Sequence, residues 1–191
     1  MNIRQILLIT ILLFSAPINA EDNAKSFEKH ANQAIKEFAE TLKSALMLSM
    51  QTDGSVKSIA VCKDIAPRVA QQISTKYNLD ISRTSLKVRN PANKADEWET
   101  TVLRDFETRL EAGETIKKLR FSEPVETEGF QQWRVMKAIG TDLVCVTCHG
   151  EKIPEQIQAE LTKLYPNDQA TGFKIGSVRG AFTVKQKLPA D

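Results

Sequence analysis

Hydrophobic side chains recur every three or four positions over residues 24–50, with Lys and Glu between them. This spacing predicts an amphipathic helix with one buried face, and the Asp53-Gly54 pair favours its end. A second helical pattern begins near residue 55 and continues to about residue 76. Pro67 interrupts this pattern, either as a kink or as the first turn of a new helix. The first part of the chain is therefore expected to be helical.

The period of the apolar positions changes after this helical part. Residues 79–85 alternate apolar and polar side chains, which is typical of a strand with one buried face. Residues 123–139 carry strand patterns divided by a turn at Glu128-Gly129. Helices followed by mostly antiparallel strands predict an α+β domain. The other expected elements are a loop over 89–93, a helix over 95–110, a short helix over 154–164 and a last strand over 176–186.

The first twenty residues follow a different pattern. Arg4 supplies early positive charge, residues 6–16 form an almost unbroken apolar run, and Ala20 precedes acidic residues. This is the order of an export signal, and the run is shorter than the roughly 20 residues that span a bilayer. An uncleaved anchor is the alternative. We expect residues 1–20 to be a signal peptide and residues 21–191 to form one soluble periplasmic domain without stable membrane insertion.

Charge says little about partners, whereas the cysteine count is informative. The 191 residues include 26 Lys and Arg and 24 Asp and Glu, for a net charge of +2, and the two signs are interspersed. We expect no nucleic-acid partner, because such proteins concentrate basic residues on one face. An exported protein meets an oxidising compartment in which thiols usually pair, but three cysteines leave one over.

Residues 145–149 read Cys-Val-Thr-Cys-His, which is the attachment pattern of c-type haem. Each Cys sulfur can add to one vinyl group of the porphyrin, and two intervening residues let one turn of chain reach both groups. The His after the second Cys would lie under the iron and bind it. Gly150 lets the backbone leave without a side chain against the macrocycle. The spacing predicts one covalent haem c held by Cys145, Cys148 and His149.

Three other uses of this spacing have less support. A zinc site would need a second pair of ligands, but the remaining Cys and His, Cys62 and His30, are isolated in the sequence. A thioredoxin-like redox pair expects a βαβ setting, whereas this segment runs into Gly150 and Pro154. A disulfide across two intervening residues would be strained.

The residues alone leave the second iron ligand open. Cys62 shares one face of a short helical stretch with Ile59, Ile65 and Ala66. This thiol could bind iron, pack as a small hydrophobic side chain or form a disulfide between two chains. The other candidate ligands are His30, Met47, Met50 and Met136.

Four stretches carry a family resemblance: residues 59–67, 89–99, 145–150 and 176–181. The second contains Arg-Asn-Pro-Ala-Asn followed by Glu-Trp-Glu, and its combination with Cys-Val-Thr-Cys-His-Gly is more specific than the latter alone. In these features the chain resembles the exported c-type haem domains with a PAS-like fold of cyanobacteria and proteobacteria. Related domains also occur as sensor modules of bacterial signalling proteins.

The resemblance implies a PAS-like sheet with N-terminal helices around one haem. In that family the iron is held by the attachment-motif His and by a Cys of the earlier helix, which match His149 and Cys62 here. A thiolate ligand favours Fe(III) and therefore a low reduction potential. Protonation and release of Cys62 on reduction, which would open the iron to a small ligand, is a further hypothesis.

Arg89 has two interpretations of equal weight. Its guanidinium can bind a haem propionate bidentately, or it can organise its own loop. Arg83 and Arg179 are weaker candidates for the propionate. Trp133 and Tyr165 could line a haem pocket, although core packing is the favoured interpretation.

Two functions fit these features. The first is a periplasmic redox protein with a low-potential haem that exchanges electrons with a partner protein. The second is a haem-based sensor of redox state, CO or NO that signals through a separate protein. The sequence after the haem motif lacks a kinase or cyclase pattern, which favours the first. We expect no enzyme, because no nucleophile and base are paired in the sequence.

Overall fold

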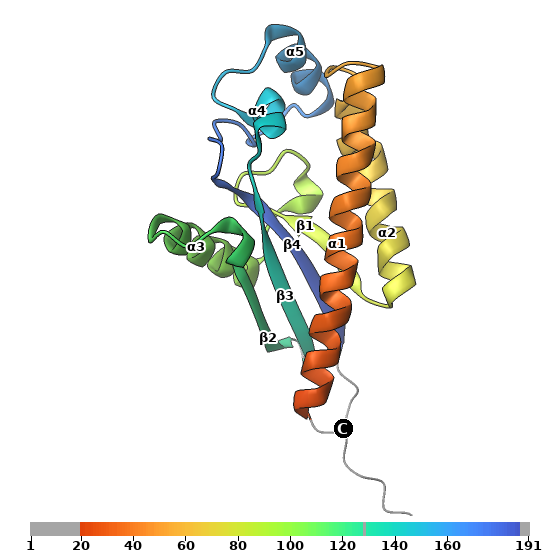
Figure 1. The fold of residues 1–191 in the computed structure, drawn as a ribbon, viewed down its shortest axis with the longest axis vertical. Coiled ribbons are helices and arrows are strands. Elements are labelled where there is room, and N and C mark those ends of the chain that lie inside the picture. Colours follow the sequence, from red (N-terminus) through yellow and green to blue (C-terminus); the bar gives the residue numbers. More distant parts are fainter. Residues whose placement is uncertain (1–19, 128, 188–191) are drawn as a thin grey trace, which may run out of the picture.

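The computed structural model of the chain describes residues 20–127 and 129–187 (Figure 1). The expected signal peptide, apart from its last residue, and Glu128 of the expected turn lie outside the described residues. Among these two ranges, none of the helices combines the length and apolar character that a bilayer crossing requires. The helices are α1 (Ala20–Thr52), α2 (Ala66–Tyr77), α3 (Glu97–Glu111), α4 (Leu143–His149) and α5 (Glu155–Leu164). The strands are β1 (Asp80–Thr84), β2 (Arg120–Thr127), β3 (Phe130–Gly140) and β4 (Val178–Lys187).

Three short helical turns connect these elements. They are a π-helical turn at Val61–Ile65 and 3-10 turns at Pro91–Asn93 and Ile116–Lys118. Pro67 stands in the first turn of α2, where a missing N–H costs nothing. The backbone stays helical from residue 61 to residue 77, so Pro67 follows a change from π-helical to α-helical hydrogen bonding within one helical stretch, and no separate helix begins there.

The four strands form one antiparallel sheet in the order β1-β4-β3-β2. Strands β2 and β3 are a hairpin, and Gly129 in its turn has a φ of +82°, which glycine adopts without steric cost. The last strand, β4, lies between β1 and β3 and so joins the earlier and later parts of the chain. The prediction of an α+β domain with helices first and antiparallel strands afterwards is confirmed.

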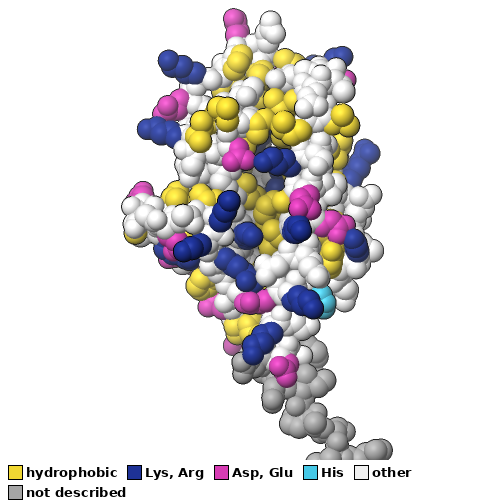
Figure 2. Space-filling view, viewed as in Figure 1, with side chains coloured by type: hydrophobic (Ala, Val, Ile, Leu, Met, Phe, Trp, Pro, Cys, Tyr) yellow, Lys and Arg dark blue, Asp and Glu magenta, His cyan; other side chains and the backbone are white. Residues whose placement is uncertain are grey.

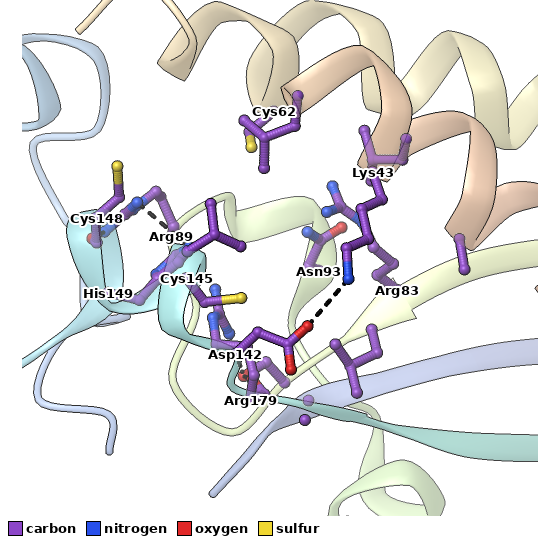
Figure 3. Close-up of a pocket in the computed structure, with 18 of the residues that line it drawn as sticks. Lys43, Cys62, Arg83, Arg89, Asn93, Asp142, Cys145, Cys148, His149 and Arg179 are labelled. Carbon is purple, nitrogen blue, oxygen red and sulfur yellow. Dashed lines mark hydrogen bonds and ion pairs between the residues drawn. The ribbon is translucent and has the colours of Figure 1, made fainter. Parts of the chain in front are cut away.

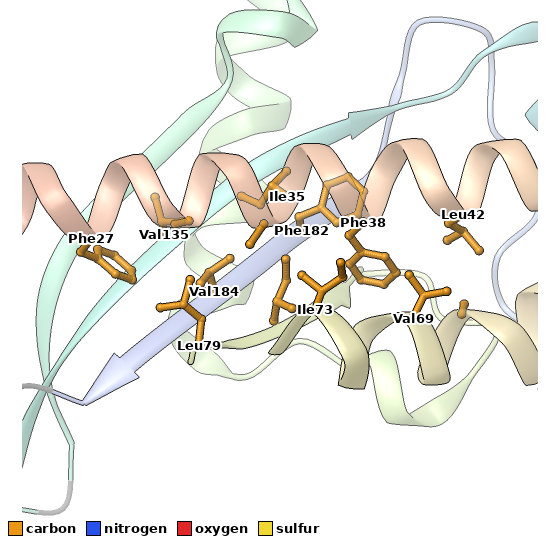
Figure 4. Packing of buried hydrophobic residues seen from close by; sticks show 14 of the residues in the cluster. Phe27, Ile35, Phe38, Leu42, Val69, Ile73, Leu79, Val135, Phe182 and Val184 are labelled. Carbon is orange, nitrogen blue, oxygen red and sulfur yellow. The ribbon is translucent and has the colours of Figure 1, made fainter. Parts of the chain in front are cut away.

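Helices α1 and α2 cover one face of the sheet (Figure 4). Val135 of β3 and Val184 of β4 are completely buried under them. Phe38 of α1 meets Phe182 of β4 with ring centroids 5.4 Å apart and planes inclined by 60°, an arrangement that aromatic rings favour. Because neighbouring residues of a strand face opposite ways, Met136 packs on the other side, in a cluster with residues of α3.

A partly buried ion cluster fixes α3 to this second face. Arg134 of β3 has a guanidinium nitrogen 2.7 Å from a carboxylate oxygen of Asp96 and 3.0 Å from one of Glu99. Its guanidinium also stands 4.2 Å from the centre of the Trp98 ring. Asp96 and Glu99 form a capping box at the start of α3. Arg134 and Glu99 are buried, whereas the Asp96 side chain is 42% exposed. Since these charges pair with one another, we assign them a structural role.

Gly180 of β4 lies against β1 at the point where the two strands meet the cavity described below. Its φ is +157°, and a Cβ there would overlap the backbone carbonyl oxygen of Thr84. Gly176 also has a positive φ, +86°, but a Cβ there would have nothing within 4 Å. Substitution of Gly176 therefore measures the cost of the backbone conformation alone, whereas substitution of Gly180 also measures the cost of crowding against β1.

We expect Gly176→Ala to lower the free energy of unfolding by about 1–2 kcal/mol, the cost of a left-handed backbone for a residue with a Cβ. Gly180→Ala should cost roughly 1–3 kcal/mol more, because it also overfills a packed site. Urea denaturation followed by circular dichroism measures both. Equal losses of unfolding free energy in the two variants would contradict this prediction, because they would mean that β1 and β4 make room for the added Cβ at residue 180 without cost.

Candidate functional site

A largely apolar cavity of about 280 Å³ lies at the end of the sheet, between α1, the π-helical turn, β1, β4 and α4 (Figure 3). The structure brings together here the main site residues expected from the sequence, although they are up to 117 positions apart in the chain, from Cys62 to Arg179. The cysteine, histidine and arginine side chains that border the cavity are Cys62, Cys145, Cys148, His149, Arg83, Arg89 and Arg179.

Cys62 lies in the π-helical turn, whose hydrogen bonds span one residue more than those of an α-helix. Such turns are rare and occur often at functional sites. The extra residue changes the face that the sequence pattern predicts: Ile59 is 4% exposed, whereas Ile65 is 38% exposed and Cys62 is half-buried. The expectation of one shared apolar face is therefore wrong at Ile65, and Cys62 lines the cavity.

Helix α4 carries both cysteines of the motif and ends at His149. A Cβ on Gly150 would lie 2.5 Å from the carbonyl oxygen of Val146, so only glycine ends this helix in this way. The helix follows β3, but all strand pairs among the described residues are antiparallel. The βαβ setting of a thioredoxin-like pair is therefore not found in this part of the chain. Burial raises the pKa of the Cys148 thiol.

The imidazole of His149 is neutral and oriented. Its Nδ1 lies 2.7 Å from the carbonyl oxygen of Ala170, which can only accept a hydrogen bond. Burial and then the positive charges of Arg179 and Arg89 hold the pKa of His149 well below its usual value. The proton therefore stays on Nδ1, and Nε2 keeps a lone pair. Arg89 Nη1 is 3.5 Å from Nε2, too far for a strong hydrogen bond, so Nε2 can serve as a metal ligand.

Arg89 is already paired with a carboxylate that the sequence analysis missed. Its Nε donates to Asp168 Oδ2 at 2.9 Å, and the two side chains are only 9% and 8% exposed. Its Nη2 also donates to the carbonyl oxygen of Cys148. Arg89 therefore ties its own loop to the end of α4 and to the segment around Ala170. No local pattern marks Asp168, which stands 79 positions further along the chain.

Arg83 and Arg179 also border the cavity, but among residues 20–127 and 129–187 neither has a carboxylate within ion-pair distance. Burial and the charges of Arg89 and Arg83 lower the pKa of Arg179 to about 10. Burial also lowers the pKa of Arg83. The Nε of Arg179 is buried without a partner in the described part of the chain. These guanidiniums give the cavity wall a positive charge that suits an anionic ligand.

The other candidates from the sequence lie in different places. Met50 borders the cavity, whereas His30 is exposed on α1 and Met136 is fully buried in the core beneath α3. Trp133 stacks on Phe27 of α1, with ring centroids 6.2 Å apart. Within the described residues, no group of three or more His, Cys, Asp or Glu side chains could hold a metal ion without a further ligand.

Tyr165 and Met47 stand outside the cavity lining. Tyr165 packs with Ile59 and residues of α5, and burial raises the pKa of its hydroxyl to about 12. Met47 is half-buried on α1. Figure 2 shows hydrophobic side chains gathered over the end of the molecule that holds α4 and α5, with charges of both signs spread over the remainder of this face.

A family model described as Tll0287-like matches residues 15–186. The crystal structure of the cyanobacterial heme-protein Tll0287 has a similar fold, with a TM-score of 0.60 and 21% sequence identity. The match covers 91% of this chain and 99% of that chain. At this identity the likeness concerns the fold. None of the curated proteins compared with the chain matches it.

Proposed function

The chain belongs to the Tll0287-like family, and we propose that it is an exported protein that holds one haem covalently through Cys145 and Cys148, with His149 as an iron ligand. The observation that carries the proposal is that two thiols and a neutral imidazole of one short helix border the same largely apolar cavity. The cyanobacterial protein of similar fold is a heme-protein, which supports the same class of ligand here.

The chemistry of these side chains fits haem. Each thiol would add across one vinyl C=C bond: a C–S bond forms at one carbon, the thiol hydrogen passes to the other, and no atom is lost. His149 offers Nε2 to the iron because the Ala170 carbonyl accepts from Nδ1, the arrangement that orients metal-binding histidines. Haem, when bound, supplies a one-electron Fe(III)/Fe(II) couple. The lining of the cavity that would hold it is largely apolar.

We assign the second iron ligand to Cys62. It lies across the cavity from α4 (Figure 3), and the π-helical turn gives its side chain a direction that a regular helix would not. Met50 borders the same cavity and is the alternative donor. The two make opposite predictions, because a thiolate lowers the reduction potential and a thioether raises it. The PAS-like classification of the sheet stays a prediction.

We assign the two haem propionates to Arg83 and Arg179. Both face the cavity without a carboxylate partner among the described residues, and both lose solvation there. Arg89, the candidate that the sequence favoured, shares its charge with Asp168. A carboxylate beside an unpaired buried guanidinium gains a charge-assisted hydrogen bond, whereas Arg89 would first have to give up its existing ion pair.

The function that these features support best is low-potential electron transfer in the periplasm with a separate redox partner protein. A neutral imidazole and a thiolate that both stay bound would change little between the two oxidation states, and such rigidity favours electron exchange over catalysis. Sensing of redox state, CO or NO is the second candidate. The sensor function is favoured by the position of Cys62, which is half-buried on a short turn. From this position the thiol could leave the iron.

The first prediction concerns attachment. Mature protein made with a haem-attachment system should have the mass of the chain plus one intact haem, because the addition loses no atoms. Cys145→Ala and Cys148→Ala should each reduce the haem that stays with the chain after acid extraction. Intact-mass spectrometry measures both. A wild-type chain without added tetrapyrrole would contradict the proposed function.

The second prediction concerns the iron ligands. Cys62→Ala should keep its covalent haem but lose the low-spin spectrum of a thiolate-bound ferric iron, and its reduction potential should rise. Met50→Leu is the matched control and should leave the absorption and electron paramagnetic resonance spectra unchanged. The opposite result would assign the ligand to Met50. Binding of CO by the reduced wild type, with loss of the Cys62 ligand, would support the sensor.

The third prediction concerns the propionates. Arg83→Gln and Arg179→Gln should each lower the midpoint potential, because a cation near the iron favours the ferrous form. The potential should also depend more steeply on pH, since a carboxylate without a cation beside it binds protons more readily. Arg109→Gln, on α3, is the control and should change neither. Potentials equal to that of the wild type would exclude these two arginines from the propionates.

A further inference from the structure

We propose that Asp168 is a positioning residue for the imidazole of His149 and that the Asp168–Arg89 ion pair adjusts the reduction potential of the haem. The inference rests on the proposed function of His149 as an iron ligand. It concerns a carboxylate outside the haem motif, on the segment between α5 and β4, and it follows from the hydrogen bonds that connect this segment to α4.

Asp168 uses its two carboxylate oxygens for two different partners. Oδ1 accepts from the backbone N–H of Ala170 at 2.8 Å. Oδ2 accepts from Arg89 Nε at 2.9 Å and lies 2.9 Å from Arg89 Nη2. The carboxylate therefore fixes the peptide of Ala170 relative to Arg89. Since both charged side chains are more than nine-tenths buried, water and salt screen their interaction weakly.

The carbonyl of Ala170 carries this constraint to the imidazole. It accepts from His149 Nδ1 at 2.7 Å and from Arg89 Nη2 at 3.3 Å. The same segment is held to the end of α4 by a backbone hydrogen bond from Phe173 N–H to the His149 carbonyl oxygen at 2.9 Å. The direction of the ring and the electron density on Nε2 depend on where this carbonyl lies. Asp168 would thus act on the iron through the Ala170 carbonyl and the His149 imidazole.

The two charges act on the iron in opposite directions. Arg89 Nη1 lies 3.5 Å from His149 Nε2, the atom that would bind the iron. Reduction of Fe(III) removes one positive charge, so a nearby cation stabilises the reduced form and a nearby anion stabilises the oxidised form. Asp168 offsets Arg89 in this position. Removing Asp168 should therefore raise the reduction potential, and removing Arg89 should lower it. Removing both should bring the potential back close to the wild-type value.

The test measures midpoint potentials of haem-loaded protein. Asp168→Asn keeps an oxygen for the Ala170 N–H, leaves Arg89 unpaired, and should shift the reduction equilibrium about tenfold towards Fe(II), which is 59 mV for a one-electron couple. Arg89→Gln should shift it by about the same factor towards Fe(III). The double variant, Asp168→Asn with Arg89→Gln, should return close to the wild-type value. Arg89→Lys keeps the charge and should stay nearer to the wild type than Arg89→Gln.

A matched pair on α3 and the turn after it provides the control. Arg109 binds Glu114 through two N–H···O bonds, both 2.9 Å. Neither residue belongs to the cavity lining. Arg109→Gln and Glu114→Gln should lower stability without changing the potential. Shifts of the same sign for Asp168→Asn and Arg89→Gln, or no shift, would overturn the proposal.

The outcomes also separate this inference from the proposed function. A wild-type chain without covalent haem contradicts the proposed function, whereas haem-loaded variants with unshifted potentials contradict only the role of the ion pair. If Asp168→Asn does not fold because it buries an unpaired cation, the sign of the shift in Arg89→Gln and the recovery in the neutral double variant still decide. A potential that rises in Arg89→Gln would overturn the proposal by itself.

Discussion

The hydrogen bond from His149 Nδ1 to the carbonyl oxygen of Ala170 is the contact on which the proposed use of His149 as an iron ligand depends. It fixes the proton on one ring nitrogen and leaves the other with a lone pair. The surroundings reinforce this choice, because burial and the nearby guanidiniums of Arg179 and Arg89 oppose a second proton and hold the pKa of His149 low. A buried base whose protonation is disfavoured is well suited to bind a metal. The bond exists only when the segment around residue 170 packs against α4.

The three arginines of the cavity show how one residue type takes different roles according to what lies nearby. Arg89 has Asp168 as a partner and donates to backbone carbonyls of two segments, so most of its binding capacity is used within the protein. Arg83 and Arg179 have no carboxylate within ion-pair distance in the described part of the chain and are desolvated. Unpaired buried charge is costly, and an anionic ligand would offset that cost. The cavity should therefore favour an anionic ligand because two of its arginines lack a carboxylate partner among the described residues, and the number of arginines matters less.

The fold and the site differ in how far local pattern could predict them. Apart from α4, the α-helices and strands followed from the period of apolar positions, and their order was enough for the α+β class. The motif at residues 145–149 was equally local. By contrast, the apolar face around Cys62 failed at Ile65, because a π-helical turn adds one residue that a 3.6-residue period does not contain. Asp168 was missed because an isolated Asp in a loop has no periodicity and its partner is distant in sequence.

Spacing along the chain was sufficient for most of the elements, their order and the chemical groups of the motif, since each depends on residues only a few positions apart. It did not predict α4, the short helix that carries the motif. The choice of distant side chains that share the cavity required the packed fold. Placing β4 between β1 and β3 brings Arg179 to the same cavity as Arg83, and packing of the loop before β4 brings Asp168 to Arg89 and Ala170 to His149. These contacts depend on three-dimensional packing and burial, which change hydrogen-bond partners and proton affinity without changing any local pattern.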